Sequence, residues 1–180
     1  MHTAATVEQI PDTLVITYLH MQHRRAFRPA YVQRPDVQIK RMEKPDVNFY
    51  RFLYRSVGER WRWRDRLLLS DAELLLALSA PGCSVHVMYV KNEPAGYIEL
   101  VREHDTTEVA YFGIRAEFFG QGLGKHLLSY GLEQAWKENN TRRVWVHTCN
   151  LDGPAALDNY IKRGFSVYDV HEKPMPERYI

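Results

Sequence analysis

The chain has very little cysteine, no long apolar run and almost no net charge. Its 180 residues include two cysteines, Cys83 and Cys149, and we expect both to be reduced, buried thiols because a chain of this length folds without disulfides; one disulfide between them is the alternative. No stretch approaches the roughly 20 apolar residues of a membrane-spanning helix, and the first residues lack a basic-then-apolar signal pattern. The formal charge is +2, which excludes a strong sequence-wide attraction to nucleic acid or anionic membranes. We therefore expect a cytoplasmic protein with no nucleic-acid and no membrane partner.

The composition is otherwise that of a soluble globular chain, with 45% apolar and 26% charged residues. A chain of this length buries roughly 70% of its unfolded surface, which is enough for one core without disulfides. Residues 13–19 are rich in β-branched and aromatic types and predict a strand, which a polar, proline-containing connection over 21–35 follows. We therefore expect one compact domain overall, in which residues 1–35 are an N-terminal extension with one strand and residues 36–180 form the main domain.

The middle of the chain predicts a short strand over 37–42 and then two helices. Asp46 is placed to cap the first helix, which Gly58 ends. Ser70 and Glu73 form a capping box at the start of the second. These signals predict that two helices follow the first two strands along the chain.

The second half predicts a strand meander followed by a strand–helix–strand unit. Strands over 85–89 and 97–100 flank a turn at Asn92-Glu93-Pro94, and a third strand covers 108–114. The remaining predicted elements are a glycine loop over 120–124, a helix burying Leu127 through Trp136, a strand over 143–148, a helix from Pro154 to Gly164 and a strand over 165–170. Because a helix connects strands 108–114 and 143–148, they should lie parallel. The sequence predicts an α/β (α+β) fold, a mixed, mainly antiparallel twisted sheet with helices on both faces.

The glycine loop can hold a phosphate, because a helix start offers bare backbone N–H groups and a positive dipole end. It is not the loop of nucleotide triphosphatases, since Phe119 stands where their first glycine would be and His126 follows Lys125. It also lacks the GxGxxG dinucleotide pattern, since the residue three after Gly122 is Lys125. The loop therefore argues against a kinase and against a Rossmann dehydrogenase, and a simple tight turn between strand and helix is the alternative interpretation.

Two motifs in the right order resemble the GNAT acetyltransferase superfamily: residues 108–124, and a helix bearing Tyr160 followed by Gly164-Phe165. The family loop, Arg/Gln-x-x-Gly-x-Gly/Ala, binds the pyrophosphate of acetyl-coenzyme A (acetyl-CoA) through backbone amides. Phe119 takes the Arg/Gln place, which puts any side-chain contact there in doubt. The resemblance implies acetyl-CoA as co-substrate, no metal, and these cofactor-binding residues: Phe112, Gly113, Ile114, Phe119, Gly120, Gln121, Gly122, Leu123, Gly124 and Lys125.

The resemblance also implies catalytic residues. Tyr160 matches the tyrosine that protonates the departing thiolate, and a phenol with a pKa near 10 can do so at neutral pH. Attack on a thioester needs a neutral amine and hence a proton acceptor. Glu108, fourteen positions before Gly122, matches the catalytic glutamate of histone-type members. Glu99, His147 and ordered water remain alternatives to Glu108.

The region after the first strand corresponds to the acceptor wall of the family. Its candidate substrate-binding residues are Phe49, Tyr50, Tyr54, Trp61 and Trp63. The same aromatic residues could instead anchor the helices to the sheet. An aromatic wall with acidic groups suits an amine through cation–π contacts.

Two other patterns carry less weight. Cys83-x-x-His86 and His147-x-Cys149 contain zinc-ligand types, but residues three apart on a strand face opposite sides, so we expect no metal. Residues 55–66 interleave cations with tryptophans, as nucleic-acid-binding segments do, but acidic residues dilute them.

The sequence thus predicts an acetyl-CoA-dependent N-acetyltransferase acting on a primary amine, of a small molecule or a protein. Neither cysteine lies in the matched motifs, which favours direct attack in a ternary complex over a covalent enzyme intermediate. The alternative is a non-catalytic acyl-CoA-binding or protein-interaction module on the same fold. A homodimer remains open, as does the identity of the acceptor.

Overall fold

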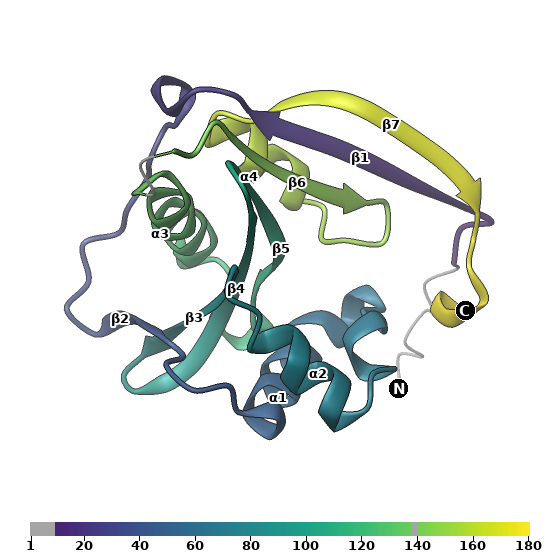
Figure 1. The fold of residues 1–180 in the computed structure, drawn as a ribbon, viewed down its shortest axis with the longest axis horizontal. Helices are drawn as coiled ribbons and strands as arrows, with labels where there is room; N and C mark the ends of the chain where they lie inside the picture. The colour runs from purple at the N-terminus through teal and green to yellow at the C-terminus, as the bar shows by residue number, and fades with distance from the viewer. Residues whose placement is uncertain (1–9, 138–139) are drawn as a thin grey trace, which may run out of the picture.

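The computed structural model describes residues 10–137 and 140–180, and in these residues seven strands form one sheet in the order β2-β3-β4-β5-β6-β1-β7 (Figure 1). The strands are β1 (Thr13–Met21), β2 (Val37–Arg41), β3 (Cys83–Val90), β4 (Glu93–Glu103), β5 (Thr106–Ile114), β6 (Arg143–Cys149) and β7 (Ser166–Pro174), and the helices are α1 (Val47–Gly58), α2 (Asp71–Leu78), α3 (Leu123–Lys137) and α4 (Ala156–Lys162). Neighbouring strands are antiparallel except for the parallel pair β5 and β6. The predicted mixed, mainly antiparallel sheet is confirmed.

Helices cover both faces of this sheet. Side chains of a strand alternate between its faces, so Val87 packs with the α1 and α2 residues Leu53 and Leu74, whereas the next residue, Met88, packs with Leu128 of α3. These two apolar clusters are separated by the sheet itself. They fix α1 and α2 on one side and α3 on the other (Figure 1).

The local helix signals are confirmed. The Asp46 carboxylate accepts a hydrogen bond from the Phe49 amide at 2.9 Å, and Ser70 and Glu73 form the reciprocal capping box. The predicted hairpin turn was wrong in its boundaries. The turn residues are Lys91 and Asn92, whose φ angles of 50° and 66° match a tight hairpin turn, so Glu93 and Pro94 already belong to β4.

The strand predicted for the N-terminal extension is an internal strand of the sheet. β1 pairs with β6 on one side and β7 on the other, and Ile16 lies opposite both Cys149 and His171. β7 is then one of the two edge strands of this sheet, and all of its residues are exposed. Figure 1 shows β1 and β7 arching together over the molecule.

The parallel strands β5 and β6 separate soon after they begin. They pair over three positions only, the last being Glu108 opposite Trp145, and then diverge toward their carboxyl ends. Figure 1 shows the loop after β6 and helix α4 beside this opening. The divergence creates a wedge in the middle of the sheet, where β5 and β6 no longer pair with each other although β5 still pairs with β4 and β6 with β1. Among the described residues, no helix is long and apolar enough to cross a membrane.

Candidate active site

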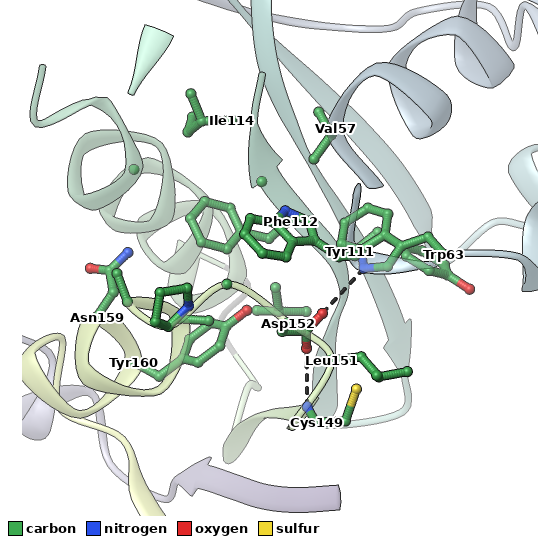
Figure 2. A pocket seen from close by; sticks show the side chains of 18 of the residues that line it. Val57, Trp63, Tyr111, Phe112, Ile114, Cys149, Leu151, Asp152, Asn159 and Tyr160 are labelled. Atoms are coloured by element: carbon green, nitrogen blue, oxygen red, sulfur yellow. Dashed lines mark hydrogen bonds between the residues drawn. The ribbon is translucent and has the colours of Figure 1, made fainter. Parts of the chain in front are cut away.

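A cavity of about 1340 Å³ occupies the wedge between β5 and β6. Its walls are β5 from Glu108 to Ile114, the glycine loop with the start of α3, the end of β6 and helix α4. Figure 2 shows side chains of β5 on one side of the space and Asn159 and Tyr160 of α4 on the other. The space is large enough for an elongated ligand that reaches from the helix starts to the far end of the wedge.

The glycine loop forms a cradle at one end of this cavity. Gly120 and Gly122 have φ angles of 77° and 72°, a backbone region that favours glycine. A Cβ atom at Gly122 would come within 3.2 Å of Lys125 Cε and 3.3 Å of Val32 Cγ1. Helix α3 begins at Leu123, so its first amides have no intrahelical partner. Free amides, a helix start and a lysine are the donor set that a pyrophosphate requires, so the residues present fit the phosphate end of coenzyme A.

The structure brings most of the predicted cofactor residues to the cavity. Gln121 does not line it, because its side-chain oxygen accepts a hydrogen bond from Arg34 Nη1 at 2.7 Å. The lining residues from the predicted set are Phe112, Gly113, Ile114, Phe119, Gly120, Gly122, Leu123, Gly124 and Lys125. At Gly113 a Cβ atom would lie 2.4 Å from Val57 Cγ1, so the close packing of α1 requires the glycine.

Tyr160 lies on α4 and faces the cavity with only 6% of its surface exposed. Its ring packs edge-on against Phe112 and Phe165, with centroids 6.1 Å and 5.9 Å away. Burial, and secondarily the negative charge of Asp152, raises the pKa of its phenol above the ordinary value. The hydroxyl is therefore protonated at neutral pH and can donate a proton into the cavity.

Asp152, in the loop after β6, was not among the residues predicted from the sequence. One carboxylate oxygen accepts hydrogen bonds from Thr148 Oγ1 at 2.7 Å and the Cys149 amide at 3.0 Å, and the other accepts from Trp63 Nε1 at 3.2 Å (Figure 2). These donors are all neutral, so the negative charge stays uncompensated by them at the cavity wall. The sequence Asp-Gly-Pro at 152–154 has the signature of a turn, which hid this role.

Glu108 and His147 line the cavity together where the strands part. His147 Nδ1 lies 3.6 Å from Glu108 Oε1, and their side chains are 46% and 24% exposed. The third predicted alternative, Glu99, is elsewhere. It is fully buried and is bound by the Tyr50 hydroxyl and the Arg66 guanidinium. Of the three side chains, only Glu108 and His147 can reach a substrate in this cavity.

Two tryptophans close one side of the cavity. Trp61 packs on Gly153, whose added Cβ would lie 3.1 Å from the indole, and Trp63 reaches Asp152. Both therefore connect the segment after α1 to the loop after β6, across the wedge. Trp63 also contacts Tyr54 and Tyr111, each with a centroid distance of 5.4 Å. Tyr111, missed by the sequence analysis, completes an aromatic box in the cavity wall.

Tyr50 and Phe49 are the two acceptor-wall candidates that do not line the cavity. The side chain of Tyr50 is fully buried between α1 and the sheet, its ring packs edge-on against Tyr97 at 5.7 Å, and its hydroxyl donates to Glu99. The ring of Phe49 stacks on Phe52 with centroids 6.2 Å apart. Tyr54, Trp61 and Trp63 do line the cavity.

Neither cysteine is in an activating environment. Cys83 and Cys149 are free thiols. Cys149 lines the cavity, and burial, with the nearby charge of Asp152, raises the pKa of its thiol to about 11. Burial raises the pKa of Cys83 to about 12. Cys83 lies in the cluster under α1, while His86 contacts Tyr130 of α3, so this pair faces opposite sides of the sheet.

The sequence pattern described as the Acetyltransferase (GNAT) family matches residues 47–165, which include the meander, the glycine loop and α4. The chain belongs to the GNAT acetyltransferase family. No curated protein sequence matches it. The matched residues include the strand β5 that lines the wedge, the glycine loop and Tyr160.

Solved structures show the same fold at low sequence identity. A GCN5-related N-acetyltransferase from Sphaerobacter thermophilus is 13% identical, with a TM-score of 0.66 over 91% of this chain and 52% of that one. An aminoglycoside acetyltransferase from an uncultured soil metagenomic sample is 17% identical, with a TM-score of 0.60 over 71% and 87% of the two chains. The PaiA N-acetyltransferase of Thermoplasma acidophilum, solved with coenzyme A, is 18% identical, with a TM-score of 0.56 over 77% and 99%. This chain thus spans about half the length of the Sphaerobacter relative.

Proposed function

We propose that this GNAT protein transfers the acetyl group of acetyl-CoA to a primary amine by direct attack in a ternary complex. The observation that carries the proposal is that a single cavity is lined by the loop at Gly120–Gly124, by Tyr160, which we assign as the proton donor, and by Glu108, which we assign as the proton acceptor. When bound, acetyl-CoA supplies an activated thioester. Family membership and the names of the structural relatives, which include N-acetyltransferases, support an acetyl donor and an amine acceptor.

The residues of the wedge have separate parts in this reaction. Glu108 accepts the proton that the amine must lose, and His147, at 3.6 Å and partly exposed, passes it toward solvent. As the amine nitrogen bonds to the carbonyl carbon and the carbon–sulfur bond breaks, Tyr160 protonates the leaving thiolate. A thiol with a pKa near 8.5 is a sufficient leaving group for this transfer. The raised pKa of the Cys149 thiol supports transfer without a cysteine intermediate.

The acceptor binds at the Trp63 side of the cavity. Its ammonium form is attracted by the Asp152 carboxylate and by the aromatic ring of Trp63, which donates a hydrogen bond to that carboxylate. Deprotonation at Glu108 then releases the nucleophile. The bound amine is a small molecule or the side chain of a protein.

The test is a panel of primary amines incubated with acetyl-CoA, monitored both by thiol release and by mass spectrometry of the acetylated amine. We expect release with at least one amine, and Tyr160→Phe to lower kcat about 10- to 1000-fold while the Kd for coenzyme A changes little. Intact thioester with every amine and also with peptide acceptors would favour the alternative, a non-catalytic acyl-CoA-binding or protein-interaction module. An unchanged kcat in Tyr160→Phe would remove its acid role.

A further inference from the structure

Arg163 is a buried cation in the cavity wall, and two of its N–H groups have no hydrogen-bond partner among the residues that the structure describes. The residue follows α4 directly, lines the cavity and is only 9% exposed. Its Nε and Nη1 atoms are covered and have no hydrogen-bond partner among the described residues. The carboxylate of Asp158, which is also on α4, pairs with Lys162 at 2.6 Å. Nothing in the described part of the chain therefore compensates these two N–H groups.

An arrangement of this kind is unfavourable in the ligand-free protein. Burying a charge costs free energy unless an opposite charge or hydrogen bonds replace the lost water. Arginine cannot avoid that cost by releasing its proton, as a buried lysine can. Its planar fork of N–H groups matches a phosphate or carboxylate, so an anion that enters the cavity would satisfy Arg163.

The position of Arg163 indicates which end of the cavity this anion occupies. The residue lies one helical turn after Asn159, whose Nδ2 atom is 3.8 Å from the Cβ position of Gly124, in the cofactor cradle. Its carbonyl accepts a hydrogen bond from the Arg28 amide at 3.0 Å, in the segment that also brings Val32 to Gly122. The acceptor side, at Asp152, has donors of its own. Arg163 thus belongs to the cradle end.

We propose that Arg163 is an anion-binding residue that holds a phosphate group of coenzyme A, in addition to the backbone cradle at Gly120–Gly124. The proposal rests on the proposed function, because it takes coenzyme A as the ligand. Either the pyrophosphate or the 3′-phosphate of that ligand supplies the negative charge and the hydrogen-bond acceptors that the Arg163 guanidinium lacks. The motif around Tyr160 and Gly164 does not reveal this role, since an arginine at 163 reads as an exposed helix end.

The test measures affinity by titration calorimetry, with coenzyme A, dephospho-coenzyme A and inorganic pyrophosphate as ligands. The variants are Arg163→Met, which keeps the length without the charge, Arg163→Lys, which keeps the charge without the fork, and Arg142→Met as control. Arg142 has a side chain that is 85% exposed, outside this cavity. We expect Arg163→Met to bind coenzyme A about 10- to 100-fold more weakly, Arg163→Lys to lie between it and the wild type, and Arg142→Met to match the wild type.

A structural role for Arg163 gives a different result. In our account the ligand-free Tm of Arg163→Met is equal to or above that of the wild type, because an uncompensated buried charge is removed. Equal affinity of the Met, Lys and wild-type proteins for coenzyme A overturns the proposal, whatever their Tm values. A loss with coenzyme A but not with the dephospho form assigns the 3′-phosphate, and an equal loss with both assigns the pyrophosphate.

Failure of the proposed function is distinguishable from failure of this inference. If the wild-type protein and Arg163→Met bind coenzyme A equally well, the acetyltransferase proposal stands and the role of Arg163 is overturned. If the wild-type protein binds inorganic pyrophosphate but not coenzyme A, and this binding depends on Arg163, then Arg163 binds a phosphate group but coenzyme A is not the ligand. If the wild-type protein binds none of the three ligands, both proposals are overturned.

Discussion

Substitution of Gly58 by alanine tests whether Trp63 is held in the cavity wall by close packing. Gly58 ends α1 with a φ of −100°, so alanine meets no backbone strain. Its Cβ, however, would lie 2.3 Å from two carbons of the Trp63 indole, closer than any real contact, and the ring must move. We expect the overpacking to cost about 1–3 kcal/mol, which the better helix propensity of alanine offsets by up to about 1 kcal/mol.

The same substitution in a Trp63→Ala background provides the control. Without the indole the new methyl group loses its three nearest contacts, so Gly58→Ala should be neutral or stabilising by up to about 1 kcal/mol. The coupling between the two positions is then about 1–3 kcal/mol, measured from urea unfolding of the four proteins followed by circular dichroism. A Gly58→Ala effect of the same sign and size in both backgrounds would refute the contact and, with it, our account of how the wall is positioned.

Three further predictions concern protons and the nucleophile. Glu108→Gln should lower kcat/KM by about 10²- to 10³-fold at neutral pH and by less at pH 10, where a far larger fraction of the amine is neutral; a wild-type pH–rate profile would exclude it as the base. Burial, with the charge of Arg41, lowers the pKa of His86 to about 4, so the unfolded state binds more protons between pH 6.5 and 4. Folding stability should therefore fall by about 3 kcal/mol as pH decreases through that window, and urea unfolding of His86→Gln should show a smaller fall. Cys149→Ala should keep at least about a third of the wild-type kcat, since no covalent step passes through the thiol, and loss of acetyl transfer with retained folding would contradict direct attack.

Signals that act over a few residues along the chain made the elements predictable. The Asp46 cap, the Ser70 and Glu73 capping box and the period-two pattern of β3 to β5 need no partner far along the sequence. The hairpin turn was displaced because Lys91 and Asn92 both adopt positive φ angles, so the turn is complete before Glu93, where β4 begins. The place of β1 between β6 and β7 depends on pairing with residues more than a hundred positions away, which no local pattern encodes.

The site was predictable where a motif carries it and not where packing creates it. The loop at Gly120–Gly124 and Tyr160 belong to family motifs, and both line the cavity. Asp152 and Arg163 enter the cavity because β5 and β6 diverge and because α4 ends where it does, and neither residue type is diagnostic in a loop or at a helix end. Tyr50 is of an aromatic type that suits a substrate-binding wall, but its position on α1 directs its side chain into the core.

The most direct test of the central claim is the Tm of the wild-type protein with and without acetyl-CoA, with free coenzyme A and adenosine diphosphate as comparators. At a concentration about a hundred times Kd, a ligand that binds only the folded state stabilises it by about 2.7 kcal/mol, or about 5–10 °C for a chain of this size. Our account predicts a shift of that size with acetyl-CoA and coenzyme A and a smaller shift with adenosine diphosphate. Equal Tm values with all three ligands and without any would show that the glycine loop is only a turn and that the cavity does not bind the coenzyme.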